Sequence, residues 1–512
     1  MLDSRHKPIA EQILVFCSEP HSMQEIMEVV NQTNRSRFKK NIINHLLVAG
    51  VLALIQSCRS EYLDEPAPTS ITSPEVVYGS YEGALAHIAG ILRRTRGQFT
   101  STDSGNLGSM YFARENKGNI SINNGSWFSF DYANDNREPN YRRTVFSWNF
   151  PYYLINQVNT FIKGVEGSAS IGAEDKNELL GQAYTMRAFF YFELSLEFQH
   201  TYSFDPTLPA PPIYTEPGAL EGKPMSTMKE MYDLITSDIE HAISIGSYYR
   251  KDKSYFNKNV SYAVAARVYQ VMGNWKKAKD YANAAYGGNP LSVLSPSFYQ
   301  NGFDDMNEGN EWLLADPQTT DQSNYYYLAP HGFYTRTESA YNNTFINKSF
   351  VALFSATDVR NQFAKTTVTD YRQWYTKKFK FAFDADLSLI RTPEMILIEA
   401  EAIYKLGDAS GAHDLLFVLQ KNRDVNAVKS SNTGSDLYEE ILTERKKELY
   451  GEIGVEWYDA KRLRRGIVRD SWHRLNMAAN PLKPDDKRFF LKIPQAEIDA
   501  NPNIPKDINA NR

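Results

Sequence analysis

Aromatic rings stand beside amide and carboxylate side chains in two polar stretches of the chain. Residues 126–137 read Ser-Trp-Phe-Ser-Phe-Asp-Tyr-Ala-Asn-Asp-Asn-Arg, and a later stretch holds Trp312, Tyr325, Tyr326 and Tyr334. Rings stack on the apolar faces of sugars or on peptide side chains, while amides and carboxylates bind polar groups. We expect a ligand surface made by the four later rings and by Trp127, Tyr132, Asn134 and Asp135. For each ring, the alternative is packing beneath its own loop.

Common catalytic motifs are absent from the sequence. It has no His-Glu-x-x-His, Gly-x-Ser-x-Gly, Gly-x-x-x-x-Gly-Lys-Ser/Thr or Cys-x-x-Cys. Asp304, Asp305 and Glu308 have the residue types of a glycosidase pair, but 61 acidic residues make chance neighbours common. Together with Asn307 they offer oxygen ligands to Ca²⁺, without the spacing of an EF-hand, and a solvated acidic turn is the alternative. We expect a protein that is not an enzyme and needs no cofactor, with bound calcium as the alternative.

An apolar run ends on a cysteine near residue 58. Residues 46–55 carry no charge, follow Arg35, Arg37, Lys39 and Lys40, and lead into Leu54-Ile55-Gln56-Ser57-Cys58. This pattern resembles the lipobox of a bacterial lipoprotein. The resemblance implies removal of residues 1–57 and attachment of acyl chains such as palmitate to Cys58, so that the protein is anchored to a membrane and does not span it.

The first residues of the chain allow a second interpretation. Segments 9–17, 22–30 and 35–54 have the pattern of three short helices, similar to a winged-helix DNA-binding module. This interpretation competes with the secretion signal for the same residues. We favour secretion, with residues 1–34 as an upstream extension and Met23 or Met27 as alternative starts.

Composition favours a large globular body. The chain has 512 residues, 42% of them hydrophobic, and a net charge of -5, without the basic surplus typical of nucleic-acid binding. Its two cysteines, Cys17 and Cys58, both lie at or before the expected cleavage site, so the mature body would have no disulfide. Aromatic residues reach 13%, including 32 Tyr, enough for cores and for binding surfaces.

Helical patterns dominate the rest of the chain. Residues 84–94, 150–162 and 178–198 each have the pattern of a helix, and the third is apolar almost all round, which predicts burial. Residues 262–290 have the small-residue spacing of a tetratricopeptide repeat, with Gly273-Asn274-Trp275 at the turn, and residues 396–419 repeat the design. Two more degenerate pairs are 178–198 with 228–243, and 437–451 with 457–463.

The predicted fold is therefore mainly α, a tetratricopeptide-like scaffold of helical pairs with long irregular loops at 101–149 and 295–347. Trp148, Trp275 and Trp457 fall within helical patterns and are expected in the core. Arg142 and Arg143 are expected to pair with loop carboxylates.

Several motifs occur together in a characteristic order. They are Gly-Gln-Ala-Tyr-Thr-Met-Arg-Ala-Phe-Phe-Tyr-Phe-Glu-Leu at 181–194, Pro-Pro-Ile-Tyr-Thr-Glu-Pro at 211–217, Glu-Arg-Lys-Lys-Glu-Leu at 444–449, Glu-Trp-Tyr-Asp-Ala-Lys-Arg at 456–462, and a closing motif at 490–503. With the lipobox and the repeats, this order resembles the SusD/RagB family. The similarity covers nearly the whole chain from Cys58 onward.

The resemblance implies a surface-exposed, lipid-anchored outer-membrane protein of Bacteroidota. Such a protein captures a nutrient, commonly a glycan or oligosaccharide, and delivers it without cleavage to a SusC-like TonB-dependent transporter. It also implies a ligand site built from loops of the N-terminal half and one later loop. The expected organisation is a removed segment 1–57, a tether 58–77 and a SusD-like body 78–512 with halves at about 78–260 and 261–512. The alternatives are a glycan-degrading enzyme and a cytoplasmic winged-helix regulator with a repeat-rich sensor body.

Overall fold

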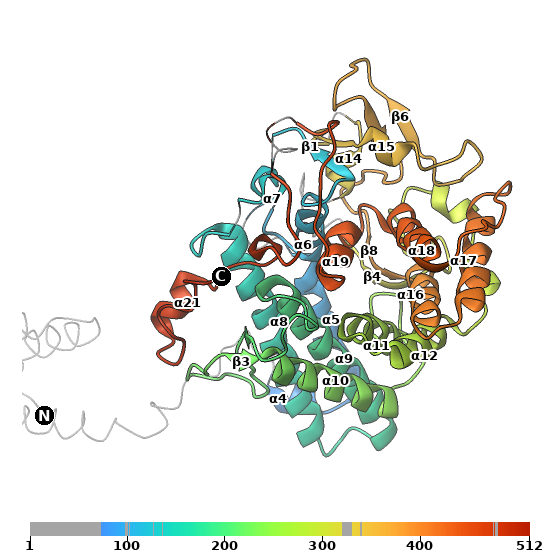
Figure 1. Ribbon diagram of the computed structural model, residues 1–512. Helices are drawn as coiled ribbons and strands as arrows, with labels where there is room; N and C mark the ends of the chain where they lie inside the picture. Colours follow the sequence, from blue (N-terminus) through green and yellow to red (C-terminus); the bar gives the residue numbers. More distant parts are fainter. Residues whose placement is uncertain are drawn as a thin grey trace, which may run out of the picture. The chain divides into compact units, whose positions relative to one another are not determined.

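Packed helices are the main regular structure of the described chain (Figure 1). The computed structural model describes residues 73–97, 101, 103–125, 127–135, 137–319, 330–337, 340–474, 476 and 480–512, all within the compact unit Ser73–Arg512. The long helices are α5 (Tyr81–Arg96), α6 (Leu107–Glu115), α8 (Arg142–Gly167), α9 (Ala173–Phe198), α10 (Met228–Ile245), α11 (Lys258–Met272), α12 (Trp275–Tyr286), α16 (Thr392–Lys405), α17 (Ala409–Arg423), α18 (Gly434–Leu449) and α19 (Val455–Arg462). Short helices are α4 (Pro74–Val77), α7 (Ser129–Ala133), α13 (Pro290–Val293), α14 (His331–Tyr334), α15 (Lys348–Val351), α21 (Gln495–Ala500), and the 3₁₀ turns η2 (Ser297–Gln300) and η4 (Lys487–Phe489).

Four helix pairs confirm the predicted scaffold. Contacts join α9 to α10, α11 to α12, α16 to α17 and α18 to α19. Two of the turns share one design. Gly273 has φ 72° and Asn274 caps α12, while Gly407 has φ 95° and Asp408 caps α17. A left-handed glycine followed by a capping side chain ends one helix and starts the next within two residues.

The helix α8 is longer than the sequence predicts. It spans 26 residues, whereas the apolar pattern covers only 150–162. In the polar start of the helix, Arg143 is buried at 1% exposed and lies 3.8 Å from an Asp131 carboxylate oxygen and 3.6 Å from one of Glu197. A paired arginine is tolerated in the interior, and hydrophobic periodicity does not detect it.

Short strands interrupt the segments expected to be irregular. The strands are β1 (Ser121–Asn123), β2 (Pro209–Ala210), β3 (Ser226–Thr227), β4 (Trp312–Asp316), β5 (Thr344–Ile346), β6 (Phe363–Lys365), β7 (Trp374–Thr376) and β8 (Leu387–Arg391). They form the antiparallel pairs β1–β5, β2–β3, β4–β8 and β6–β7. The expectation that 101–149 and 295–347 are irregular was therefore wrong in part. Partners such as Ile122 and Phe345 are far apart in sequence, so local patterns do not reveal them.

Two large hydrophobic clusters form the interior. The larger is built from the helices, and the smaller is an aromatic cluster in the strand-containing part, with Phe298, Phe303, Trp312, Phe333 and Tyr334 among its buried members. The tryptophans expected in the core behave as predicted. Trp148 and Trp457 are buried, and Trp275 packs partly buried against the larger cluster.

A buried network of charges joins the C-terminal helices to the strands. The Glu448 carboxylate of α18 accepts hydrogen bonds from Arg391 at 2.9 Å, Arg423 at 2.9 Å and Arg360 at 3.1 Å. All four side chains are at most 1% exposed. Burial alone would raise the pKa of the Glu448 carboxyl, but the three arginine charges hold this pKa well below its usual value.

Candidate functional site

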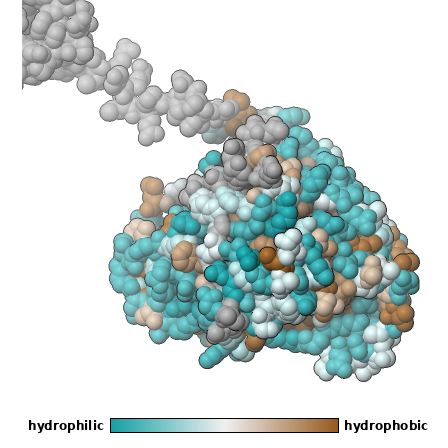
Figure 2. Space-filling view, turned by 90° about the horizontal axis from the view of Figure 1, so that it is seen from above, coloured by the Kyte–Doolittle hydropathy of each residue, from teal (hydrophilic) through white to brown (hydrophobic). Residues whose placement is uncertain are grey.

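One end of the molecule is built from loops that come from distant parts of the chain. We call this surface the loop face and define it by residues 119–125, 127–135, 340–347, 371–375 and 469–474. It includes β1, α7 and β5, and Figure 1 shows β1, α14 and α15 gathered near the top of the molecule. Seen from above, the surface is mostly hydrophilic, with small apolar patches among polar residues (Figure 2).

Hydrogen bonds fix the course of the segment that follows β1. The Asn123 amide donates to the Trp127 carbonyl at 2.8 Å and accepts from the Gly125 backbone N–H at 2.8 Å. Asn124 is tied to later segments, because its N–H donates to the Asn343 carbonyl and its side-chain oxygen accepts from the Tyr371 hydroxyl at 2.6 Å. The loops are therefore held in place before any ligand arrives, which lowers the entropic cost of binding.

Arg469 joins the C-terminal part of the chain to this segment. Its guanidinium donates to three backbone carbonyls, those of Gly118 at 3.0 Å, Tyr132 at 2.6 Å and Asn116 at 2.8 Å. The side chain is buried and lies 4.4 Å from the centre of the Tyr132 ring. Burial lowers the pKa of Arg469 to about 10, so the group stays charged at neutral pH.

His473 supports the same segment in its neutral form. Its Nε2 lies 3.0 Å from the Asn119 carbonyl, and its Nδ1 lies 2.8 Å from the Tyr132 hydroxyl. Because a carbonyl only accepts, Nε2 carries the proton and Nδ1 accepts from Tyr132. Burial, together with the Arg469 charge, lowers the pKa of His473 to about 4.

The predicted site residues divide into exposed and buried sets. Trp127 is half-buried, with the Arg142 guanidinium 5.3 Å from its ring centre, and Asp135 is exposed. The expectation that Arg142 pairs with a loop carboxylate is confirmed by its contact with Asp103 at 2.7 Å. Trp127 and Asp135 both lie on the loop face, where a ligand could reach them.

The other described candidates lie inside the protein. Tyr132 is 1% exposed, Asn134 4%, Trp312 1% and Tyr334 0%. Tyr334 stacks on Phe379 at 5.6 Å, and Trp312 belongs to the aromatic cluster. We correct the expectation that these rings stack on a ligand, because a ring without an exposed face offers no stacking surface in this conformation. Tyr325, Tyr326 and Cys58 lie outside the described residues.

Sequence reasoning missed other rings on the loop face. Phe130 is 50% exposed and lies within the predicted segment, while Tyr371, Trp374 and Trp472 are partly exposed on later segments. The stretch Asp-Tyr-Arg-Gln-Trp-Tyr at 370–375 mixes rings with polar groups in the same way as 126–137. This mixture of aromatic and polar residues is the sequence pattern from which the rings of Tyr371 and Trp374 could have been predicted.

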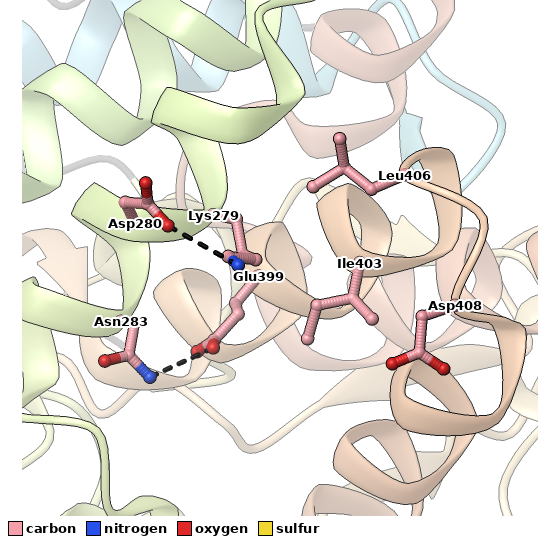
Figure 3. Close-up of a pocket in the computed structure, with 7 residues that line it drawn as sticks. All are labelled: Lys279, Asp280, Asn283, Glu399, Ile403, Leu406 and Asp408. Atoms are coloured by element: carbon pink, nitrogen blue, oxygen red, sulfur yellow. Dashed lines mark hydrogen bonds and ion pairs between the residues drawn. The ribbon is translucent and has the colours of Figure 1, made fainter.

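A pocket of about 480 Å³ lies between α12 and α16 (Figure 3). Its polar groups contact one another, since the Asn283 amide donates to Glu399 at 3.0 Å and Lys279 lies 3.5 Å from Asp280. The Tyr286 hydroxyl also donates to Glu399. The two hydrogen bonds to Glu399 join the two helices, and the lining contains no aromatic ring among its described residues. We therefore interpret this pocket as part of the packing between two scaffold helices and not as a sugar-binding site.

Carboxyl groups with raised pKa values lie in the interior. Burial raises the pKa of Glu115 to about 7, that of Asp131 to about 6 and that of Asp316 to about 7. Each of these side chains is at most 2% exposed. A general acid must reach its substrate, and these groups have almost no exposed surface with which to do so.

The acidic turn considered for calcium is held by protein contacts. Asp304 lies 2.9 Å from the Lys380 ammonium, and an Asp305 carboxylate oxygen accepts from the Asn307 backbone N–H at 2.8 Å. Within the described ranges, no three His, Cys, Asp or Glu side chains gather as a metal site requires. Likewise, none of the helices described here has the length and apolar composition to cross a membrane.

Comparison with known proteins identifies the fold and the family. A family described as "Starch-binding associating with outer membrane" matches residues 61–270, and the SusD family matches residues 252–509. The chain belongs to the SusD family, as the sequence motifs predicted. A curated relative, SusD-like protein P38 of Formosa agariphila, is 22% identical over 396 residues, covering 66% of this chain and 76% of its own.

Solved structures show the same architecture. A SusD-like carbohydrate binding protein from Bacteroides vulgatus superposes with a TM-score of 0.76 at 26% identity, covering 84% of this chain and 98% of its own. A SusD superfamily protein from Bacteroides thetaiotaomicron has a TM-score of 0.72 at 25% identity, covering 83% and 99%. The predicted mainly helical fold is thereby confirmed.

Proposed function

We propose that the protein is a lipid-anchored, surface-exposed outer-membrane protein that captures a glycan and delivers it, uncleaved, to a SusC-like TonB-dependent transporter. Membership of the SusD family and the likeness to a carbohydrate binding protein support this function. The observation that carries the proposal is the loop face, where Trp127 and Phe130 expose rings in the same segment as Asp135. Rings for sugar faces and oxygens for hydroxyls are the groups that sugar binding requires.

Substitution of an exposed ring tests the site. A glycan array with the full chain would first identify a ligand, whose affinity would then be measured by isothermal titration calorimetry. We expect Trp127→Ala and Phe130→Ala each to weaken binding by about tenfold, the effect of losing one stacking contact. Tyr249→Ala is the matched control, because Tyr249 is also exposed, at 57%, but lies between α10 and α11. Unchanged affinity in both loop-face variants would refute the site.

Two further measurements address anchoring and catalysis. Cells grown with labelled palmitate should incorporate the label into the wild-type protein but not into Cys58→Ala, because acylation needs the thiol. Purified protein incubated with its glycan should release no new reducing ends. A label retained in Cys58→Ala would contradict the anchor, and new reducing ends would favour the glycan-degrading enzyme.

The transporter partnership requires its own experiment. Purification of the tagged protein from detergent-solubilised outer membranes should bring down a TonB-dependent transporter. Recovery of the tagged protein without any such partner, at the salt concentration of the growth medium, would contradict the delivery step.

A further inference from the structure

We infer a second ligand site, for a neutral sugar ring, in a pocket between α8, residues 214–219 and α21. We call it the α8 pocket. The cavity measures about 380 Å³, and its lining includes Tyr152, Tyr153, Tyr214, Asn149, Asn156 and Glu216. None of its described lining residues belongs to the loop face. In Figure 1, α8 and α21 lie on the side of the molecule away from α12 and α17.

The aromatic rings of this pocket are held in fixed orientations. Tyr152 and Tyr214 meet edge to face, with ring centres 5.8 Å apart. The Tyr152 hydroxyl donates to the Pro212 carbonyl at 2.6 Å, and the Tyr214 hydroxyl accepts from the Lys223 backbone N–H at 3.0 Å. The hydroxyls are thus used by the protein, while the rings line the cavity. Rings fixed in advance bind a flat apolar face with little loss of entropy.

Tyr153 gives the pocket its most accessible ring. It is 37% exposed, and the Arg94 guanidinium of α5 lies 5.2 Å from its ring centre. A cation near the ring restrains the side chain. Tyr153 follows Tyr152 in the sequence, and both residues belong to the lining of the cavity.

Polar groups complete the lining. The Asn156 side-chain oxygen accepts from the Gly218 backbone N–H at 2.8 Å, which orients the amide. Asn149 and Glu216 are exposed at the same cavity. Amides and carboxylates at a ring-lined wall can donate to and accept from sugar hydroxyls.

Charge selects among possible ligands. The described lining residues include the carboxylates Glu216 and Glu497 but no Lys, Arg or His. Cations near the lining are already engaged, since the Lys163 ammonium lies 3.5 Å from Glu216 and the Lys223 ammonium lies 5.5 Å from the Tyr214 ring centre. The described lining itself therefore offers an anionic ligand no cation to pair with, which favours an uncharged ligand. A neutral pyranose ring fits both the rings and the charge. The inference depends on the proposed function only for the choice of glycans as probes.

Calorimetry can count the sites. The full chain would be titrated with maltohexaose and with cellohexaose, two neutral oligosaccharides of different linkage, and with a galacturonic acid oligomer as the anionic comparison. We expect two binding events with at least one neutral sugar. Tyr153→Ala should weaken one event by about tenfold, as for the loss of one stacking contact, and leave the other unchanged.

A second variant blocks the pocket without removing a contact. Ala219 is exposed and lines the cavity, so Ala219→Trp would fill it and should abolish the same event. Tyr249→Ala should preserve both events. Circular dichroism of each variant would verify folding.

The outcomes separate this inference from the proposed function. A binding event that survives Trp127→Ala but is weakened in Tyr153→Ala and lost in Ala219→Trp supports the α8 pocket, whatever the loop face binds. Binding that is unaffected by both pocket variants overturns the inference and leaves the proposed function standing. Equal binding of the galacturonic acid oligomer at the pocket would also overturn it, because the described lining has no cation to pair with the carboxylates of that probe.

Discussion

Tyr132 and Trp127 belong to one short segment, yet their surroundings give them different roles. Tyr132 faces inward, where its hydroxyl bonds to His473 and its ring lies against Arg469. Trp127 keeps an accessible edge. The sequence could predict the segment, because its mixture of rings and amides is visible there. It could not predict which ring turns inward, because the deciding partners lie more than 330 residues away.

Asp316 offers a test of burial at the scale of one residue. Burial raises the pKa of its carboxyl to about 7, against a smaller lowering by the hydrogen bond from Thr95 at 2.8 Å. The unfolded chain ionises near the ordinary value of 3.8, whereas the folded protein retains the proton up to about pH 7. The folded state therefore holds more protons in this window. The contribution to stability is present below pH 3.8 and is lost as the pH rises to 7.

Asp316→Asn should remove this pH dependence. We expect the free energy of unfolding of the variant, relative to the wild type, to rise by about 1–3 kcal/mol between pH 4.5 and pH 8. Urea unfolding at both pH values measures the difference. Asp414→Asn is the control, since the Lys429 hydrogen bond and charge lower the pKa of that exposed carboxyl below 3.8. The group is therefore ionised in the folded and in the unfolded chain at both pH values, and the difference between this variant and the wild type should stay nearly constant. If the free energies of unfolding of Asp316→Asn and of the wild type change by the same amount between the two pH values, the prediction is contradicted.

At the scale of elements, helix pairs were predictable and helix ends were not. Small residues and the Gly-Asn turn marked α11 and α12 because close packing requires them locally. The first turns of α8 were not predicted because Arg143 looks exposed in the sequence, although it is buried beside the carboxylates of Asp131 and Glu197. The strand β1 was not predicted for a similar reason, because its hydrogen-bonding partner β5 lies far away in the sequence.

Gly181 tests how closely α9 approaches the end of α10. A Cβ atom at this position would lie 2.7 Å from the Gly246 Cα, a backbone atom that cannot rotate away. Gly181→Ala should therefore destabilise the protein by about 1–2 kcal/mol, since overpacking exceeds the gain in helix propensity. Gly90→Ala in α5 is the matched control, because nothing lies within 4 Å of the added atom. It should stabilise by up to about 1 kcal/mol.

Thermal unfolding of both variants would show the contrast. The melting temperature should fall for Gly181→Ala and should stay the same or rise for Gly90→Ala. Equal melting temperatures would show that α9 and α10 can separate without cost.

The charge network centred on Glu448 acts at the scale of the whole molecule. It joins α17, α18 and the end of β8, which are brought together only in the folded chain. Glu448→Gln leaves three buried guanidinium groups short of a counter-charge, and we expect a loss of about 3–5 kcal/mol. Urea unfolding at pH 7 measures this loss.

A surface pair provides the comparison for the network. Glu439 lies 2.8 Å from Arg465, and both side chains are more than 40% exposed. Glu439→Gln should cost no more than about 1 kcal/mol. If the two variants unfold at the same urea concentration, the buried network does not hold the C-terminal half together.

Arg469 also determines when during synthesis the loop face can take its final shape. The three carbonyls to which its guanidinium donates hydrogen bonds lie 337 to 353 positions earlier in the chain. A ribosome finishes those early loops long before it reaches the arginine, so the scaffold can form while the loop face is still unanchored. A chain cut short before this residue would keep many of its helices yet lack the hydrogen bonds that shape these loops, which become possible only with the last tenth of the polypeptide.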